Sequence, residues 1–284
     1  MINDLLNKTK TSLSFEVFPP KKDDEFQAVF QIMDSLASLH PDFISCTYGA
    51  GGSKAGKTVE IASYIQNQLN IDAIAHITCV GFRQSDLEKN CELLEKEGIR
   101  HILALRGDRP QWMSDEQFEN REFFYASDMV AHLKKNTSLL IAGACYPEKH
   151  YEAASIDSDL EHLKAKVDAG VSFLISQMFF ENDIFYRFLE RIGKAGITVP
   201  VCAGIMPITS SKQLGTSVSL SGSSVPKELA DIIAKYGEDK EDMRKAGMDY
   251  AIRQILDLKE HGVDGIHIYT MNRPKTTAEI VAQI

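Results

Sequence analysis

Two short stretches carry residues whose types and spacing could do chemistry. Residues 49–58 read GAGGSKAGKT and match the phosphate-loop pattern G-x-x-x-x-G-K-[ST] through Gly51, Gly56, Lys57 and Thr58. Residues 12–18 read SLSFEVF, where Glu16 is the one ionisable side chain in an apolar run. A carboxylate buried there should be paired, protonated or functional. The first stretch predicts a nucleotide phosphate site and the second a general acid, with a structurally fixed carboxylate as the alternative.

Other polar side chains follow apolar runs further along the chain. Arg106 and Asp108 lie in LRGDRP at 105–110, where the guanidinium could hold a phosphate or carboxylate and the aspartate could bias a ligand. A mutual ion pair between them is the alternative. Gln177 can donate and accept hydrogen bonds, which suits an amide or pterin-like edge, although simple packing also accounts for it. His76 is equally compatible with a core position and with a ligand contact.

Several familiar kinds of site find little support. The histidines show neither HxH nor HExxH spacing, and the five cysteines form no CxxC pair, so we expect no metal site. The pattern GxSxG is absent, and none of the apolar β-rich runs contains a lysine that could form a Schiff base. Hydrolase and class I aldolase chemistry are therefore disfavoured.

Composition narrows the class of protein. The 284 residues are 44% hydrophobic and 25% charged, as in an ordinary globular protein. A net charge of −9 opposes binding to nucleic acid or to an anionic membrane surface. The first residues are polar, and no run approaches the length of a membrane span. We expect a soluble cytoplasmic protein with reduced, buried cysteines.

The elements that must position these residues alternate regularly. Eight β-rich runs are predicted as strands, at 12–18, 42–48, 72–80, 100–106, 138–146, 172–178, 198–205 and 265–271. Helical spacing lies between them, for example at 26–39, 58–69, 85–98 and 159–170. The pattern predicts a single-domain (β/α)8 TIM barrel over residues 1–284, with a doubly wound open sheet as the alternative. Residues 215–226, GTSVSLSGSSVP, are predicted as an exposed connection.

The strand ends, taken in order, resemble a known family. The matching segments are SFEVFPPK (14–21), FISCTYGAGGS (43–53), HITCVG (76–81), HILALRGDRP (101–110), YASDMV (125–130), GACYPEKH (143–150), KVDAGVSFLISQMFF (166–180), PVCAGIMPI (200–208) and GIHIYTMNRP (265–274). Together they resemble methylenetetrahydrofolate reductase along essentially the whole chain. The resemblance implies a barrel that holds FAD noncovalently. Such an enzyme takes hydride from a reduced nicotinamide and passes it, in a ping-pong cycle, to methylenetetrahydrofolate in one-carbon and methionine metabolism.

The resemblance also implies roles for residues at matching positions. Glu16 would be the general acid that opens the folate's imidazolidine ring, and Asp108 would favour the resulting cation and temper the flavin potential. The folate and nicotinamide would contact Thr47, Gln177, Gln213 and Arg273. FAD would contact Tyr48, Ala50, His76, Arg106, Gly107, Asp108, Tyr125, Ala126, Tyr146, His150, Ala153, Asp159, His162 and Lys166.

Two positions depart from the family pattern. Ser217 stands where many relatives have an aromatic or large apolar residue, and His162 stands where an amide residue is expected.

NADH is the expected donor, with NADPH or a protein electron carrier as alternatives, and we expect a homo-oligomer. The competing functions are a P-loop NTPase and a non-enzymatic ligand-binding barrel. If the reductase resemblance holds, Lys57 and Thr58 begin a helix rather than hold a phosphate.

Overall fold

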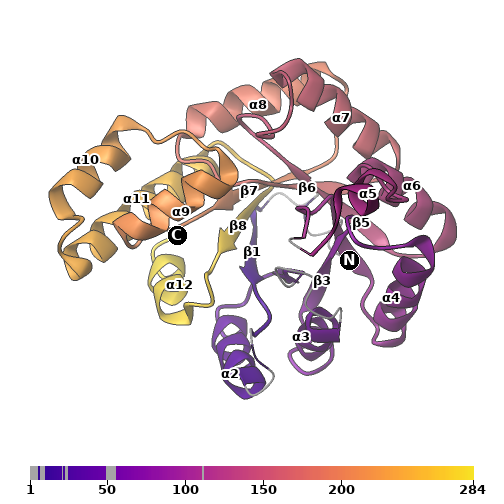
Figure 1. Cartoon of the computed structure of the whole chain (residues 1–284). Coiled ribbons are helices and arrows are strands. Elements are labelled where there is room, and N and C mark those ends of the chain that lie inside the picture. Colours follow the sequence, from indigo (N-terminus) through magenta and orange to yellow (C-terminus); the bar gives the residue numbers. More distant parts are fainter. Residues whose placement is uncertain (1–5, 7–9, 21, 23–24, 49–55, 111) are drawn as a thin grey trace.

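The computed structural model describes residues 6, 10–20, 22, 25–48, 56–110 and 112–284. Its described residues form eight parallel strands that close into a barrel in sequence order (Figure 1). The strands are β1 (Ser12–Val17), β2 (Phe43–Cys46), β3 (Asp72–Thr78), β4 (His101–Leu105), β5 (Leu140–Cys145), β6 (Phe173–Ser176), β7 (Val201–Ile205) and β8 (Gly265–Tyr269). All eight predicted strands are confirmed. The open-sheet alternative is wrong, because β1 pairs with β8 as well as with β2.

Helices cover the outside of the barrel, as Figure 1 shows. They are α2 (Phe26–Ala37), α3 (Gly56–Asn67), α4 (Gln84–Lys96), α5 (Asp115–Glu119), α6 (Ala126–Asn136), α7 (Ile156–Asp168), α8 (Asn182–Lys194), α9 (Ser211–Ser221), α10 (Lys227–Tyr236), α11 (Lys240–Glu260) and α12 (Pro274–Val281). In α8 the buried residues Phe185, Phe188 and Ile192 recur at helical spacing and form one apolar stripe. The same amphipathic logic places the other helices against the sheet.

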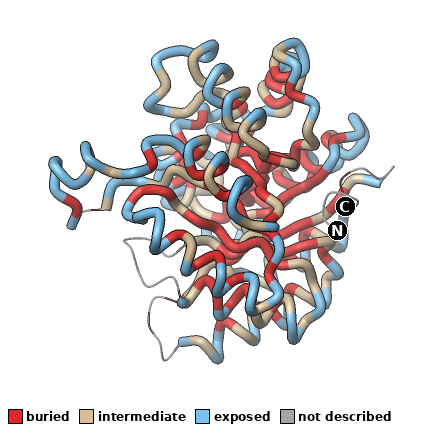
Figure 2. The backbone as a smooth tube through the Cα atoms, turned by 90° about the vertical axis from the view of Figure 1, so that its right-hand side faces the viewer, coloured by how far each residue is buried: buried red, intermediate tan, exposed pale blue. Residues whose placement is uncertain are grey.

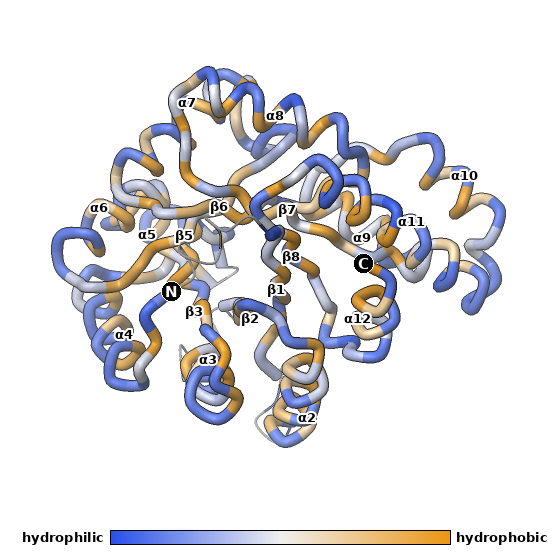
Figure 3. Tube along the Cα trace, turned by 180° about the vertical axis from the view of Figure 1, so that it is seen from behind, coloured by the Kyte–Doolittle hydropathy of each residue, from blue (hydrophilic) through white to orange (hydrophobic). Residues whose placement is uncertain are grey.

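The buried residues form two layers, one on each side of the strands. Figure 2 shows the buried residues concentrated in the barrel and the exposed ones on the outer helices, and Figure 3 shows apolar residues along the strands. Phe15 and Val17 belong to the cluster between sheet and helices. Side chains alternate along a strand, so Ser14 and Glu16 point to the other side, into the barrel. A second cluster, which includes Phe43, forms the apolar barrel interior.

The prediction of an exposed connection at 215–226 is wrong for residues 215–221, which belong to helix α9, whereas residues 222–226 do connect α9 to α10. Ser210 caps this helix by accepting a hydrogen bond from the Gln213 backbone N–H at 3.2 Å, and Gly222 ends it with φ of +71°. Serine, threonine and glycine are weak helix formers, so propensity favoured a loop. Burial of Leu214 and Ser217 against the barrel overrides that preference. The S-x-x-Q capping pattern at 210–213 was the available sequence signal.

Candidate active site

A cavity of about 690 Å³ opens at the carboxyl ends of the strands, the face where (β/α)8 barrels hold their active sites. It brings together twelve of the predicted site residues from separate parts of the chain. They are Glu16, Thr47, Tyr48, His76, Arg106, Gly107, Asp108, Tyr146, His150, Gln177, Gln213 and Arg273. The structure therefore gathers the predicted acid, the predicted substrate contacts and half of the predicted cofactor contacts around one space.

The other predicted cofactor contacts lie outside the lining of this cavity. Tyr125 and Ala126 start helix α6, Ala153 lies in the loop after β5, and Asp159, His162 and Lys166 lie on α7. Two of them connect to the cavity rim: Asp159 Oδ2 accepts from the His150 backbone N–H at 3.2 Å, and Lys166 Nζ donates to the Ala144 carbonyl. The Tyr125 and His162 rings stack with centroids 5.2 Å apart. Ala50 lies outside the described residues.

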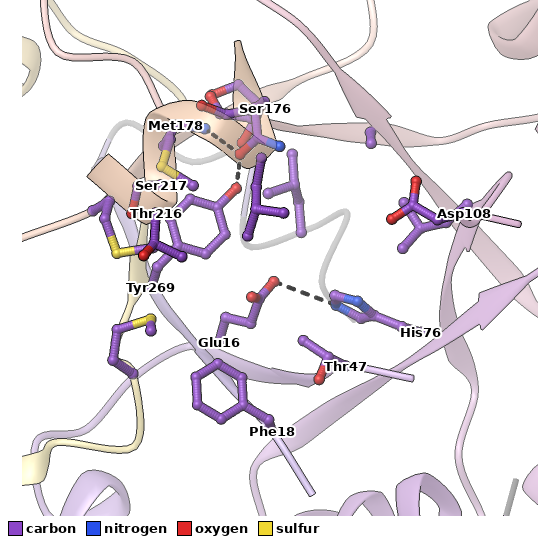
Figure 4. Close-up of a pocket in the computed structure, with 18 of the residues that line it drawn as sticks. Glu16, Phe18, Thr47, His76, Asp108, Ser176, Met178, Thr216, Ser217 and Tyr269 are labelled. Carbon is purple, nitrogen blue, oxygen red and sulfur yellow. Dashed lines mark hydrogen bonds and ion pairs between the residues drawn. The ribbon is translucent and has the colours of Figure 1, made fainter. Parts of the chain in front are cut away.

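Glu16 lies at the centre of the cavity. Its side chain is 15% exposed, and Oε2 lies 3.7 Å from His76 Nε2 and 3.9 Å from His267 Nε2. Figure 4 shows the carboxylate pointing into the space between His76 and Tyr269. The Glu16 backbone carbonyl accepts a hydrogen bond from Thr270 Oγ1 at 2.7 Å, which fixes this part of β1 against β8. The strand is thus held rigidly while its carboxylate faces the cavity.

The two imidazoles beside Glu16 differ in their bonding. His76 is 4% exposed, and its Nε2 has no hydrogen-bond partner among the described residues. Burial lowers the pKa of His76 to about 4, although the Glu16 charge acts against this shift. His76 is therefore neutral at pH 7. His267 bonds Ser14 Oγ through Nδ1 at 2.8 Å and Ser45 Oγ through Nε2 at 3.3 Å. Sequence reasoning did not include His267 in the site, because its partners Ser14 and Ser45 lie 253 and 222 residues away along the chain.

The rim of the cavity beyond β4 depends on a glycine. Gly107 has φ of +80°, and a Cβ there would lie 2.7 Å from Thr78 Cβ, so only glycine fits. The guanidinium of Arg106 forms a two-pronged pair with Glu152, one arm of which is NH2 to Oε1 at 3.0 Å. Glu152, rather than Asp108, is thus the ion-pair partner of Arg106. This pairing lowers the pKa of Glu152 to about 2. No local sequence pattern pointed to Glu152, which follows Arg106 46 residues later.

A tyrosine missing from the predicted set supports Gln177. The Tyr269 hydroxyl donates to the Ser176 carbonyl at 2.6 Å, and Ser176 Oγ accepts from the Gly204 N–H at 2.9 Å. Gln177 Oε1 accepts from the Met178 N–H at 2.8 Å, so its amide NH2 is the end left to donate to a ligand. Tyr269 ends β8 and lines the cavity. Position at a strand end was the signal that could have included it.

Gln213 and Arg273 meet through Thr209. Gln213 Oε1 accepts from the Thr209 N–H and hydroxyl, both at 3.0 Å, and its Nε2 donates to the Pro207 carbonyl at 2.9 Å. Arg273 donates to Thr209 Oγ1 at 2.5 Å. Ser217, one turn along α9 from Gln213, is 7% exposed and also lines the cavity. The position flagged as a departure is therefore part of the cavity wall.

The phosphate-loop motif does not build a separate site in the described residues. Lys57 and Thr58 lie in the first turn of α3, which confirms that they begin a helix. Lys57 Nζ donates to the Pro20 carbonyl at 3.2 Å, and Thr58 Oγ1 donates to the Thr47 carbonyl at 3.0 Å. Both side chains thereby connect α3 to the loops that follow β1 and β2. Residues 49–55 of the motif lie outside the described part of the chain.

The described residues also bear on metal binding and on membrane insertion. They contain no group of three or more His, Cys, Asp or Glu side chains placed to hold a metal ion. None of the helices formed by these residues combines the length and apolarity that crossing a membrane requires.

Comparison with known proteins converges on one family. The family model for methylenetetrahydrofolate reductase matches residues 1–284. The 5,10-methylenetetrahydrofolate reductase of Escherichia coli is 35% identical over 269 residues, covering 95% of this chain and 89% of its own. Methylenetetrahydrofolate reductase (NADH) 1 of Arabidopsis thaliana is 33% identical over the whole chain, which spans 50% of the plant protein.

A solved structure supports the fold. An uncharacterized Clostridium thermocellum protein described as binding two copies of 5-methyl-5,6,7,8-tetrahydrofolic acid superposes with a TM-score of 0.70 at 14% identity, covering 99% of this chain and 97% of its own. At that identity the likeness concerns the fold alone. The full-length family match and the bacterial relative carry the assignment: this chain belongs to the methylenetetrahydrofolate reductase family.

Proposed function

We propose that this protein reduces methylenetetrahydrofolate to methyltetrahydrofolate with a reduced nicotinamide as donor, using FAD bound in the barrel cavity and Glu16 as general acid. One observation carries the proposal: a carboxylate near the carboxyl end of β1 faces the cavity, in a chain of this family. NADH is the proposed donor, and a relative's name includes it.

The cavity residues fit FAD in charge and shape. Arg106 and Gly107 lie together on the rim. The Arg106 guanidinium can donate two parallel hydrogen bonds and Gly107 has positive φ, which suits a pyrophosphate that approaches the backbone closely. Tyr48, Tyr146 and His150 offer ring faces and edges to a flat heterocycle. The volume of about 690 Å³ lies in the range of cofactor sites. Asp159 and Lys166 would extend the site along α7.

When bound, FAD would accept hydride from the nicotinamide and return it to the folate, in two half-reactions that use the site in turn. The chain's own residues would bind and orient each substrate. The Gln177 amide NH2 would donate to whichever substrate is present, while Arg273, held by Thr209, would anchor the folate. Thr47 would contact the nicotinamide.

Glu16 would deliver the proton that opens the folate's imidazolidine ring. Its distances to His76 and His267 exceed hydrogen-bond length, so the carboxyl group keeps its oxygens for the substrate. Burial lowers the pKa of His76 to about 4, so this neighbour of Glu16 is a neutral imidazole at pH 7. Asp108 on the facing rim would favour the cationic iminium formed on the substrate.

The test is the visible spectrum of the purified protein. We expect flavin absorption bands that NADH bleaches and methylenetetrahydrofolate restores. Colourless protein that reduces methylenetetrahydrofolate would refute the FAD proposal, and a flavin spectrum that NADH bleaches but folate leaves bleached would refute the proposed acceptor.

A further inference from the structure

The Arg106 guanidinium is already occupied by groups of this chain. NH1 and NH2 face the two carboxylate oxygens of Glu152, and Nε donates to the Gly107 carbonyl at 3.3 Å. Arg106 first, and Tyr151 after it, lower the pKa of Glu152. The fork that would hold a ligand phosphate is therefore filled by a carboxylate of similar shape.

Other charged groups lie around this pair. His150, close to it in the chain, is acted on by two cations, Arg106 and Lys166, and by two carboxylates, Glu152 and Asp159. Lys166 Nζ donates to the Ala144 carbonyl, and Asp108 also lines the cavity. Turning Glu152 away from Arg106 would remove one negative charge from this region and leave the guanidinium fork open to a phosphate.

The Glu152 side chain can turn away from the ion pair more readily than the Arg106 side chain. Its side chain is 45% exposed, whereas that of Arg106 is 23% exposed. Arg106 lines the cavity directly. An ion pair exposed to this degree contributes little to stability, so exchanging one carboxylate for another anion on the same guanidinium costs little.

We propose that Glu152 is an internal counter-ion that competes with ligand phosphate groups for Arg106 and thereby sets how strongly the site prefers phosphate-bearing ligands. The inference rests on the proposed function, which supplies such a ligand in FAD. Glu152 pairs with the Arg106 fork and turns toward solvent when a phosphate arrives. It thus weakens binding of the phosphate-bearing part of the ligand and leaves the flat ring system unaffected.

The test uses the full-length chain freed of flavin and titrated by calorimetry with FAD, FMN and riboflavin. Glu152→Gln keeps the shape and removes the charge. We expect the Kd of this variant for FAD and FMN to fall about threefold to fivefold, the range for partly exposed ion pairs, while that for riboflavin stays unchanged. Glu148→Gln is the matched control, because Glu148 lies in the same loop but accepts from the Ser224 N–H.

The outcomes separate this inference from the proposed function. Binding of FAD that is unchanged or weaker in Glu152→Gln, or a gain shared equally by riboflavin or by Glu148→Gln, overturns the competing role of Glu152 and leaves FAD binding intact. A wild-type chain that binds none of the three flavins overturns the proposed function and this inference with it.

Discussion

Glu16→Gln is the sharpest perturbation of the proposed chemistry. Glutamine has nearly the same size and keeps a hydrogen-bonding end group in the cavity, but it has no carboxyl proton to give. A positioned general acid contributes about 10²- to 10⁴-fold to a rate. We therefore expect reduction of methylenetetrahydrofolate to slow by that factor, which corresponds to about 3–5 kcal/mol of transition-state stabilisation.

The variant should fold and should still react with the nicotinamide. Glu16 Oε2 lies 3.7 Å from His76 Nε2, and burial keeps that imidazole neutral at pH 7, so no buried cation loses its partner at that position. The stabilising hydrogen bond from Thr270 uses the Glu16 backbone carbonyl, which the substitution preserves. Hydride transfer from the nicotinamide requires no proton from this position.

The assay measures the two half-reactions separately by stopped flow. Bleaching of the flavin by NADH should match wild type within about threefold, whereas reoxidation by methylenetetrahydrofolate should slow by at least about a hundredfold. Glu16→Asp, which keeps an acid but withdraws it by one methylene, should lie between the two. Equal folate turnover in Glu16→Gln would refute the role of Glu16, and equal loss in both half-reactions would show a structural role instead.

Three further predictions concern stability and the phosphate-loop motif. Since the folded pKa of His76 is about 4, below its unfolded value of 6.5, the unfolded chain binds more protons between these pH values, and up to about 3 kcal/mol of stability should be lost as pH falls through that window. Urea unfolding at several pH values checks this, and His76→Gln should flatten the profile. Gly204→Ala should lower the free energy of unfolding by about 1–3 kcal/mol or more, because its Cβ would lie 2.2 Å from the Ser176 carbonyl oxygen. Gly215→Ala, which has open space around it, should not lower it. Equal unfolding midpoints for the two variants would contradict the packing argument. The wild-type protein should show no magnesium-dependent ATP turnover, and Lys57→Ala should change nothing in that assay, because the Lys57 ammonium donates to a backbone carbonyl in the loop after β1. Phosphate release by the wild-type protein that disappears in this variant would favour the P-loop NTPase hypothesis.

The predicted residues reached the cavity most directly where a residue's position followed from its own strand. Glu16, His76 and Gln177 lie on or directly after strands whose apolar runs are plain in the sequence, and all three reach the cavity. The second half of α9, residues 215–221, was predicted as a connection because its composition favours a loop and only packing makes it helical. Of the α9 residues that line the cavity, Gln213 and Ser217 were singled out through the family resemblance, whereas Lys212 and Thr216 were not.

The sequence by itself determined the order of strands and helices, the closed parallel barrel they imply, and the face that carries the polar strand ends, because hydrophobic periodicity is a local property of the chain. The tertiary structure decided the partners. That Arg106 pairs with Glu152 rather than with Asp108, and that Tyr269 supports β6 through Ser176, follows from strand register and loop path. Such contacts join residues dozens of positions apart, and no local pattern encodes the distance between them.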